Sequence, residues 1–167
     1  KAFGIPDDLT QDKLLAEVFI GGEAELVAEM LPIAAAGSAN DVKAHAKLEK
    51  FNGPGLSALP VLESVFLTGS GAKEPFTAKL SSYVTAKTRD NLAHLAPQIE
   101  ALILRIEAAR PRRIALAAAQ STLALHAFAR AFLARYDATK QAHGWLDFDD
   151  LILKTKALLT NPQVAEW

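Results

Sequence analysis

The side chains best suited to chemistry lie in the last quarter of the sequence, where three acids surround one aromatic residue. Asp147, Asp149 and Asp150 flank Phe148, and Leu151 begins an apolar run. An Asp at 147 with a second acid three residues later is the spacing of an N-cap with a carboxylate in the first helical turn. Adjacent acids on a helix point in different directions, so 149 and 150 make a poor acid–base pair. The pattern predicts a helix start.

The motifs of common catalytic sites are missing from the sequence. It contains no GxxxxGK[ST] phosphate loop, no apolar strand ending in Asp-Glu, no HExxH and no GxSxG. Gly69-Ser-Gly71 lacks both the preceding strand and the following Gly-Lys of a phosphate loop. Without cysteine there is no thiolate zinc site and no cysteine nucleophile. We therefore expect no catalysis by this chain alone and no cofactor or metal bound to it.

Charge is unevenly distributed, although the formal net charge is only −1. Residues 1–70 contain five Lys or Arg against ten Asp or Glu, and residues 101–143 contain seven against two. Such a basic segment is typical of a surface that attracts a polyanion, and a solvated helix surface is the alternative. The candidate contacts to a nucleic-acid backbone are Arg112, Arg113, Arg130, Arg135 and Lys140.

A second, weaker phosphate signal lies in residues 76–88, the segment whose secondary structure is most ambiguous. Its hydroxyl side chains alternate with Lys79 and Lys87, and Arg89 follows directly. These groups could contact phosphate, and a polar surface loop is the simpler interpretation.

The elements that position these residues are predicted to be helices, because the chain is rich in Ala and Leu and poor in aromatic and β-branched residues. We expect one all-α domain over residues 1–167. Apolar spacing, caps and breakers predict helices over 10–19, 23–36, 38–51, 57–67, 89–95, 97–110, 112–143 and 147–159. Pro32 should kink or split the second helix, and Arg110-Pro111 should end or kink the sixth. Asn161-Pro162 should start a last short turn.

The longest predicted helix, 112–143, is the expected spine of an irregular helical domain. Its apolar and small residues recur at alternating spacings of four and three, which predicts a helix–helix packing seam formed by Ile114, Ala118, Ser121, Leu125, Phe128, Phe132 and Tyr136. In the shorter third helix we expect a thin apolar stripe of Val42, Ala46 and Leu48.

Two classes of location are disfavoured by the sequence. No apolar run approaches the roughly 18 residues of a membrane span. The first residues do not show the basic-then-apolar pattern of a signal peptide. We therefore expect a cytoplasmic protein that does not contact a membrane.

The acid–aromatic segment also carries a resemblance to a known family. Tyr136-(x)10-Asp147-Phe148-Asp149-Asp150-Leu151-Ile152 resembles the segment just ahead of the Walker B strand in UvrD/PcrA/RecB-type helicases of superfamily one. Residues from about 123 to 167 are most similar to the AddA subunit of bacterial AddAB helicase–nucleases. In residues 1–90 the resemblance is confined to an acidic, Ala/Leu-rich character and the turn at 36–41.

The resemblance implies a place in a larger motor protein. In those helicases a helical insertion, subdomain 1B, interrupts the first motor domain, and the chain returns to the motor through the Asp-Phe-Asp-Asp-Leu helix. Residues 1–167 would then be a 1B-like insertion with a return segment at about 147–167. ATP and magnesium would be held by other parts of an ATP-dependent DNA helicase, which would also be an exonuclease if it is of the AddA type.

The resemblance also implies a partner and a role for Phe148. In relatives this aromatic lies along the single-stranded DNA track, where stacking holds a base of any sequence. The alternative is that Phe148 packs under the helix start as a core anchor. The implied function is non-catalytic contact with single-stranded and duplex DNA during double-strand-break repair and recombination, beside an AddB-like subunit.

Two other functions are left open by the sequence. Within the same family, the parent could be a UvrD/PcrA-like helicase without a nuclease. In a different class, the chain could be a protein–protein interaction module that docks a partner subunit through the long helix's seam and the acidic first half.

Overall fold

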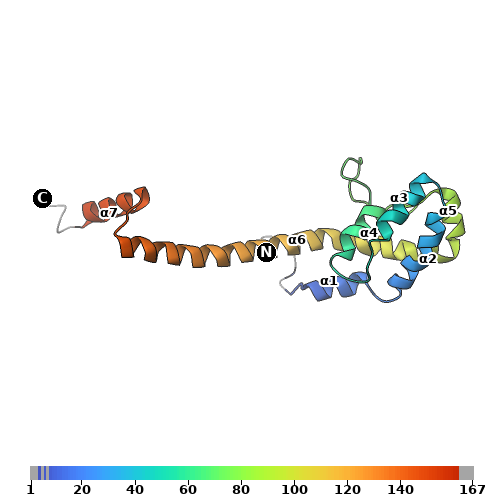
Figure 1. Cartoon of the computed structure of the whole chain (residues 1–167), viewed down its shortest axis with the longest axis horizontal. Coiled ribbons are helices and arrows are strands. Elements are labelled where there is room, and N and C mark those ends of the chain that lie inside the picture. The colour runs from blue at the N-terminus through green and yellow to red at the C-terminus, as the bar shows by residue number, and fades with distance from the viewer. Residues whose placement is uncertain (1–3, 5, 7, 162–167) are drawn as a thin grey trace. The chain divides into compact units, whose positions relative to one another are not determined.

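The computed structural model describes residues 4, 6 and 8–161, which form an all-α structure (Figure 1). The expected fold class is thus confirmed. The elements are α1 (Gln11–Val18), α2 (Glu23–Ala35), α3 (Ala39–Leu48), α4 (Ala58–Phe66), α5 (Ala86–Asn91), a 3-10 turn (Ala93–Leu95), α6 (Ala96–His143) and α7 (Phe148–Thr160). The described residues contain no strand, and an isolated antiparallel bridge joins Leu67 to Ala78. Within that part of the chain, no helix is both long and apolar enough to cross a membrane.

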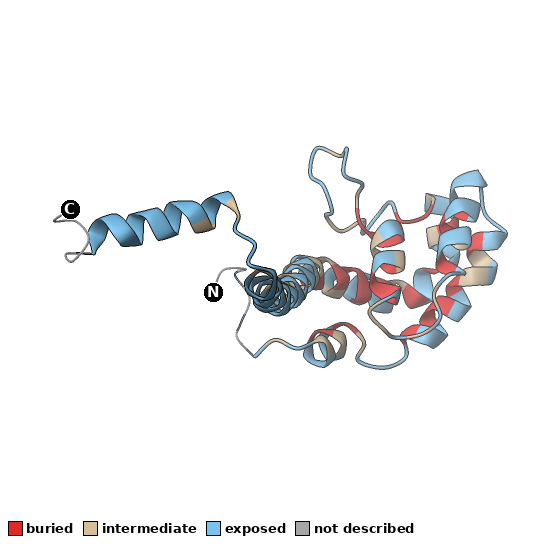
Figure 2. Ribbon diagram, turned by 60° about the vertical axis from the view of Figure 1, so that its left-hand side comes forward, coloured by how far each residue is buried: buried red, intermediate tan, exposed pale blue. Residues whose placement is uncertain are grey.

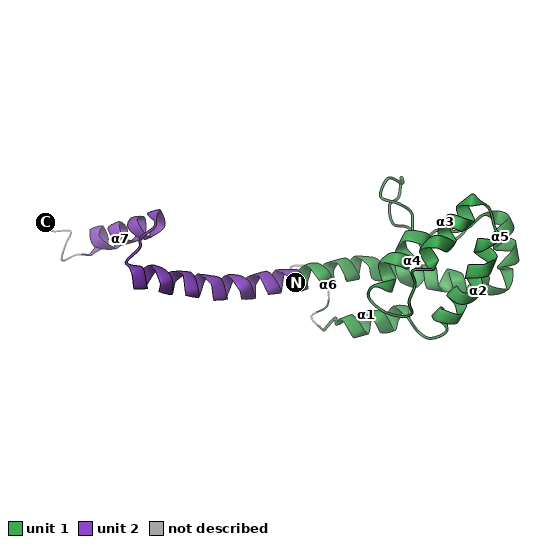
Figure 3. Cartoon of the chain, viewed as in Figure 1, with its two compact units in different colours: residues 1–120 green, residues 121–167 purple. Residues whose placement is uncertain are grey.

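The contacts of the chain divide it into two compact units, residues 1–120 and 121–167, with the boundary inside α6 (Figure 3). From the sequence we predicted one domain over residues 1–167. The expected return segment falls in the second unit, and the last turn expected at Asn161-Pro162 lies mostly outside the described residues.

The first unit has a well-packed core. Helices α2 to α5 surround the amino-terminal part of α6, and their buried residues face it (Figures 1 and 2). Phe66 is the largest fully buried side chain, and its ring meets the edge of Tyr83 at a centroid distance of 6.0 Å. The buried side chains of α6 recur at helical spacing, at Ile99, Leu102, Ile103, Ile106, Ala109 and Leu116.

Helix α6 runs without interruption from Ala96 to His143, so the prediction of a long helix starting near 112 is wrong about its start. Pro97 lies in its first turn, as expected. Pro111 removes one backbone hydrogen bond and costs about 3 kcal/mol in a helix interior. The turns on both sides are held by Ala109 and Leu116 in the core and by three arginine ion pairs, and this packing outweighs the local penalty. Pro32 likewise fails to split α2.

The buried face of α3 differs from the predicted stripe. Val42 and Ala46 are exposed, whereas Asp41, Ala44 and Leu48 are buried. The spacing of three and four is helical, but the face includes an acid, so counting only apolar residues placed the stripe wrongly.

Asp41 is fully buried, and five hydrogen bonds from three residues on two segments of the chain converge on its carboxylate. Oδ2 accepts from the backbone N–H and hydroxyl of Ser38, both at 2.8 Å, and from the hydroxyls of Thr85 (2.7 Å) and Thr88 (2.9 Å). Oδ1 accepts from the Thr85 N–H at 2.7 Å. Burial alone would raise the pKa of Asp41, but the hydrogen bonds from Thr85 and Ser38 outweigh it and hold the pKa well below its ordinary value.

The second unit has no buried residue among those described (Figure 2). Within the second unit, no described helix covers the seam predicted from Ile114 to Tyr136: Leu125, Phe128 and Phe132 are all more than half exposed. Phe128, Phe132 and Tyr136 stack on one another at centroid distances of 5.9 Å. The expected packing seam is therefore an uncovered aromatic ladder in this structure.

Candidate functional site

Just before the acid–aromatic segment, α6 ends abruptly at His143. Gly144 has φ +66°, its N–H bonds to the Gln141 carbonyl at 3.3 Å, and the Trp145 N–H bonds to the Lys140 carbonyl at 2.9 Å. These are the two hydrogen bonds of a Schellman motif, which requires a left-handed residue just after the helix. The Trp145 ring stacks on His143 at 4.5 Å. The turn brings the acids at 147 and 150 back over the last turns of α6.

Asp147 and Asp150 start α7 as the sequence predicts. The Asp147 carboxylate accepts from the Asp150 N–H at 2.9 Å, and the Asp150 carboxylate accepts from the Asp147 N–H at 3.1 Å. This reciprocal capping box satisfies two N–H groups that would otherwise lack partners at the helix start. Asp149 points elsewhere and is exposed, which agrees with the expectation that the two neighbouring acids do not act together.

Lys140, near the end of α6, forms ion pairs with the same two acids. Its ammonium lies 2.9 Å from Asp147 Oδ2 and 2.7 Å from Asp150 Oδ2, and the Tyr136 hydroxyl donates to Asp147 Oδ2 at 3.2 Å. Hydrogen bonds to Asp150 and Asp147 raise the pKa of Lys140, and the hydrogen bond from Lys140 lowers the pKa of Asp147 to about 2. Lys140 also lies 4.9 Å from the centre of the Tyr136 ring. We call Tyr136, Lys140, Asp147 and Asp150 the hinge cluster.

Phe148 is left outside this cluster. Its side chain is 84% exposed, although it lies between Asp147 and Asp150, whose carboxylates are engaged. Asp149, which directly follows it, is also exposed. The core-anchor alternative has no support within the described residues, because no side chain covers Phe148. Leu151, the remaining motif residue, is about half exposed. The segment thus presents an aromatic face on a helix start that is fixed by charge and hydrogen bonds.

The charged groups of the hinge cluster are paired with one another. Its carboxylates have backbone and lysine partners, and Lys140 is held in its charged form, so neither an unpaired base nor a nucleophile is present in the cluster. A hollow of about 510 Å³ lies beside it, lined in part by Trp145, Asp150 and Lys154. Among the described residues, no group of three His, Asp or Glu side chains could hold a metal ion.

The basic residues proposed to contact DNA fall into two groups. Arg112 lies 2.6 Å from Glu17, and Arg113 makes a bidentate pair with Glu63 at 2.7 and 2.8 Å. Lys140 belongs to the hinge cluster. These three cations therefore have acid partners within their own units. By contrast, Arg130 and Arg135 are exposed and have no ion-pair partner among the described residues.

The charge asymmetry of the sequence is largely resolved inside the first unit. Four of the seven cations in residues 101–143, Arg105, Arg110, Arg112 and Arg113, pair with acids from residues 1–70. Glu23 is buried, accepts from Arg105 at 2.9 Å and also accepts the N–H groups of Ile20 and Gly21. These pairs join α1, α2 and α4 to α6, so most of the basic segment is structural.

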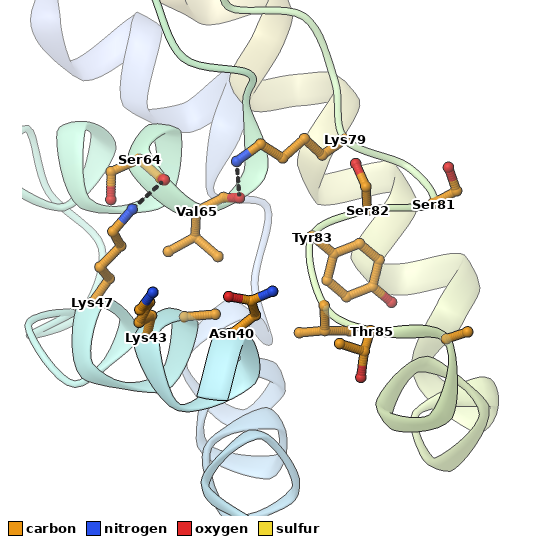
Figure 4. A pocket seen from close by; sticks show the side chains of 13 residues that line it. Asn40, Lys43, Lys47, Ser64, Val65, Lys79, Ser81, Ser82, Tyr83 and Thr85 are labelled. Atoms are coloured by element: carbon orange, nitrogen blue, oxygen red, sulfur yellow. Dashed lines mark hydrogen bonds between the residues drawn. The ribbon is translucent and has the colours of Figure 1, made fainter. Parts of the chain in front are cut away.

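The first unit also contains a basic pocket that we did not predict from the sequence. Lys79 lines it, together with Lys43 and Lys47 of α3 (Figure 4). The other two cations considered with Lys79 do not line this pocket: Lys87 lines a different hollow, and Arg89 donates to the carbonyl of Ser81, one of the lining residues. The spacing of four between 43 and 47 places both lysines on one helix face, and that signal was available in the sequence.

Comparison with protein-family models, with curated proteins and with solved structures gave no match. Functional inference therefore depends on the residues, their geometry and the motif resemblance.

Proposed function

We propose that the chain is a non-catalytic, DNA-contacting helical subdomain of an ATP-dependent helicase–nuclease subunit of the AddA type, acting in double-strand-break repair and recombination. ATP and magnesium would be bound by other parts of the parent protein, in the cytoplasm, beside an AddB-like subunit. The observation that carries the proposal is the exposure of Phe148 on a helix start where Asp147 and Asp150 are engaged in the hinge cluster.

The hinge cluster matters because free acids would repel a DNA strand. Lys140 contributes one positive charge between Asp147 and Asp150, and the N–H groups at the start of α7 reduce the negative charge that remains, including that of the exposed Asp149. An exposed aromatic ring in this setting can stack on any base, which contributes about 1–3 kcal/mol per base. Arg130 and Arg135, which lack ion-pair partners among the described residues, supply charge for the phosphate backbone.

The test uses the 167-residue chain and a fluorescent oligothymidylate, with duplex DNA of the same length as comparison. We expect Phe148→Ala to weaken single-strand binding by about tenfold, since it removes one stacking contact, and to weaken duplex binding less. Leu159→Ala is the matched control, because Leu159 is 71% exposed on the same helix and is aliphatic. Equal loss on both DNAs, or equal loss in both variants, would contradict stacking by Phe148.

The electrostatic part of the proposal is tested by charge reversal. Arg130→Glu combined with Arg135→Glu should weaken binding to all sequences alike and reduce its salt dependence. Arg112 and Arg113 are unsuitable for this test because their replacement breaks ion pairs to Glu17 and Glu63. Absence of salt-sensitive binding by the unmodified chain at low ionic strength would contradict a DNA role.

The second candidate function is a protein–protein interaction module, and the uncovered aromatic ladder favours it. Phe128, Phe132 and Tyr136 form a continuous exposed stack, and such a face is typical of a surface that another protein covers. Association of the chain with a partner subunit in the absence of any DNA binding would favour this module. The same ladder is also compatible with a UvrD/PcrA-like parent that lacks a nuclease.

A further inference from the structure

The basic pocket of the first unit is lined by three segments of the chain: α3, the end of α4 and residues 79–86. Helix α3 contributes one face, and the loop before α5 closes the other side (Figure 4). The pocket has a volume of about 520 Å³, and its polar lining includes Asn40, Lys43, Lys47, Lys79, Ser81 and Ser82. Among the described residues, no Asp or Glu lines it. Three lysines thus border one hollow that has no acidic residue in its described lining.

Two of the lysines are held in place by the end of α4. Lys47 Nζ donates to the Ser64 carbonyl at 3.0 Å, and Lys79 Nζ donates to the Val65 carbonyl at 3.2 Å. These carbonyls belong to the last turn of α4, where cations are favoured. An ammonium group has three donors, so each lysine retains two beyond the hydrogen bond that fixes it.

Capping of α4 does not account for the whole pocket. Lys43 has no hydrogen-bond or ion-pair partner among the described residues, yet it lies on the same face of α3 as Lys47. Burial and the nearby charge of Lys47 lower the pKa of Lys79, which indicates that the cations oppose one another at this site. An anion between them would relieve that repulsion.

We infer that this pocket binds a phosphate group, through the ammonium groups of Lys43, Lys47 and Lys79. Phosphate suits the site because it carries up to two negative charges and accepts several hydrogen bonds from donors arranged around it. The group could belong to a nucleic-acid backbone or to a small phosphate compound. The inference is independent of Phe148 and of the proposed function.

The test follows amide resonances of the full chain during titration with sodium pyrophosphate at fixed ionic strength, with sodium acetate as the comparison anion. We expect saturable shifts at residues 40–47 and 79–85. Lys43→Gln should weaken the affinity roughly tenfold, since it removes one charge-assisted hydrogen bond. Lys73→Gln, which removes a lysine that does not line the pocket, should leave the affinity unchanged.

The Lys43 variant should fold normally because the lysine has no hydrogen-bond or ion-pair partner among the described residues. Shifts spread over all surface lysines, shifts matched by acetate, or an affinity unchanged by Lys43→Gln would overturn the inference.

A second titration, with oligothymidylate and the Phe148→Ala chain, distinguishes a nucleic-acid backbone from a small phosphate compound as the ligand. Shifts at the pocket that pyrophosphate competes away indicate a strand backbone, and shifts with pyrophosphate alone indicate a small phosphate compound. Either result supports the site. If the Phe148→Ala chain still binds pyrophosphate, the phosphate pocket is supported even where the proposed DNA role fails.

Discussion

At the scale of single residues, the first unit depends on the buried carboxylate of Asp41. The residue joins the start of α3 to Thr85 and Thr88, which lie at and just inside the start of α5. From the sequence we predicted Ser38 or Asn40 as the cap of this helix, but not a buried acid beside it. The reason is physical: an Asp three residues after a Ser is an ordinary cap, and only the tertiary fold brings the two threonines to it.

The close packing around Asp41 gives Gly37 a specific role. A Cβ at position 37 would lie 2.6 Å from Asp41 Oδ2 and 2.8 Å from the Thr88 hydroxyl oxygen. We therefore expect Gly37→Ala to lower the free energy of unfolding by about 1–3 kcal/mol, the usual effect of overpacking a tight site. Urea denaturation followed by circular dichroism measures this change.

The control for Gly37→Ala is Gly55→Ala, since a Cβ at 55 meets nothing within 4 Å. It should be neutral or stabilise by up to about 1 kcal/mol, because Ala restricts the unfolded chain more than Gly does. Equal stability of the two variants would show that the packing around Asp41 leaves room for a Cβ at position 37.

At the scale of elements, α6 is held to the other helices of its unit by ion pairs concentrated near Pro111. Glu63 of α4 lies 3.3 Å from Arg110 Nε and 2.7 Å from Arg113 Nε, and its side chain is nearly buried. Arg110 also lies 3.4 Å from the centre of the Phe76 ring. A single carboxylate thus offsets two guanidinium groups on either side of the proline.

Removing the charge of Glu63 should destabilise the first unit. We expect Glu63→Gln to lower the free energy of unfolding by about 3 kcal/mol, since it leaves two half-buried arginines without an acid partner. Glu49→Gln is the control: its side chain is more than half exposed, and it should change stability by less than about 0.5 kcal/mol. Thermal and urea unfolding measure both variants, and equal stability of the two would show that the pairing of α4 with α6 contributes little.

Elements were predictable from the sequence where local signals decide them. Thr10 caps α1, Pro97 lies in the first turn of α6, and Asp147 caps α7, as their spacing indicates. The continuity of α6 through Pro111 was not predictable, because it depends on contacts from α1 and α4. For the candidate site, the sequence predicted the acids at the helix start. It did not predict their ion pairs with Lys140, because these require the turn at Gly144.

At the scale of the whole molecule, the two units differ in how they are stabilised. The first unit buries a continuous apolar core, and the second has no buried residue among those described. In the second unit, cohesion comes from the hinge cluster and from the stacked rings of Phe128, Phe132 and Tyr136. Helices without a packed face are only marginally stable in water. The second unit is therefore expected to open locally without unfolding of the first.

Hydrogen exchange measured by mass spectrometry tests this difference within one helix. Amides of α6 around Ile99, Leu102 and Ile106 should exchange more than about a hundredfold more slowly than those around Phe128 and Phe132, since the former open only with the core. Because both segments belong to α6, helix propensity alone cannot explain a difference of that size. Oligothymidylate should slow exchange in α7 if DNA covers Phe148. Equal protection along all of α6 in the free chain would contradict two separately stabilised units.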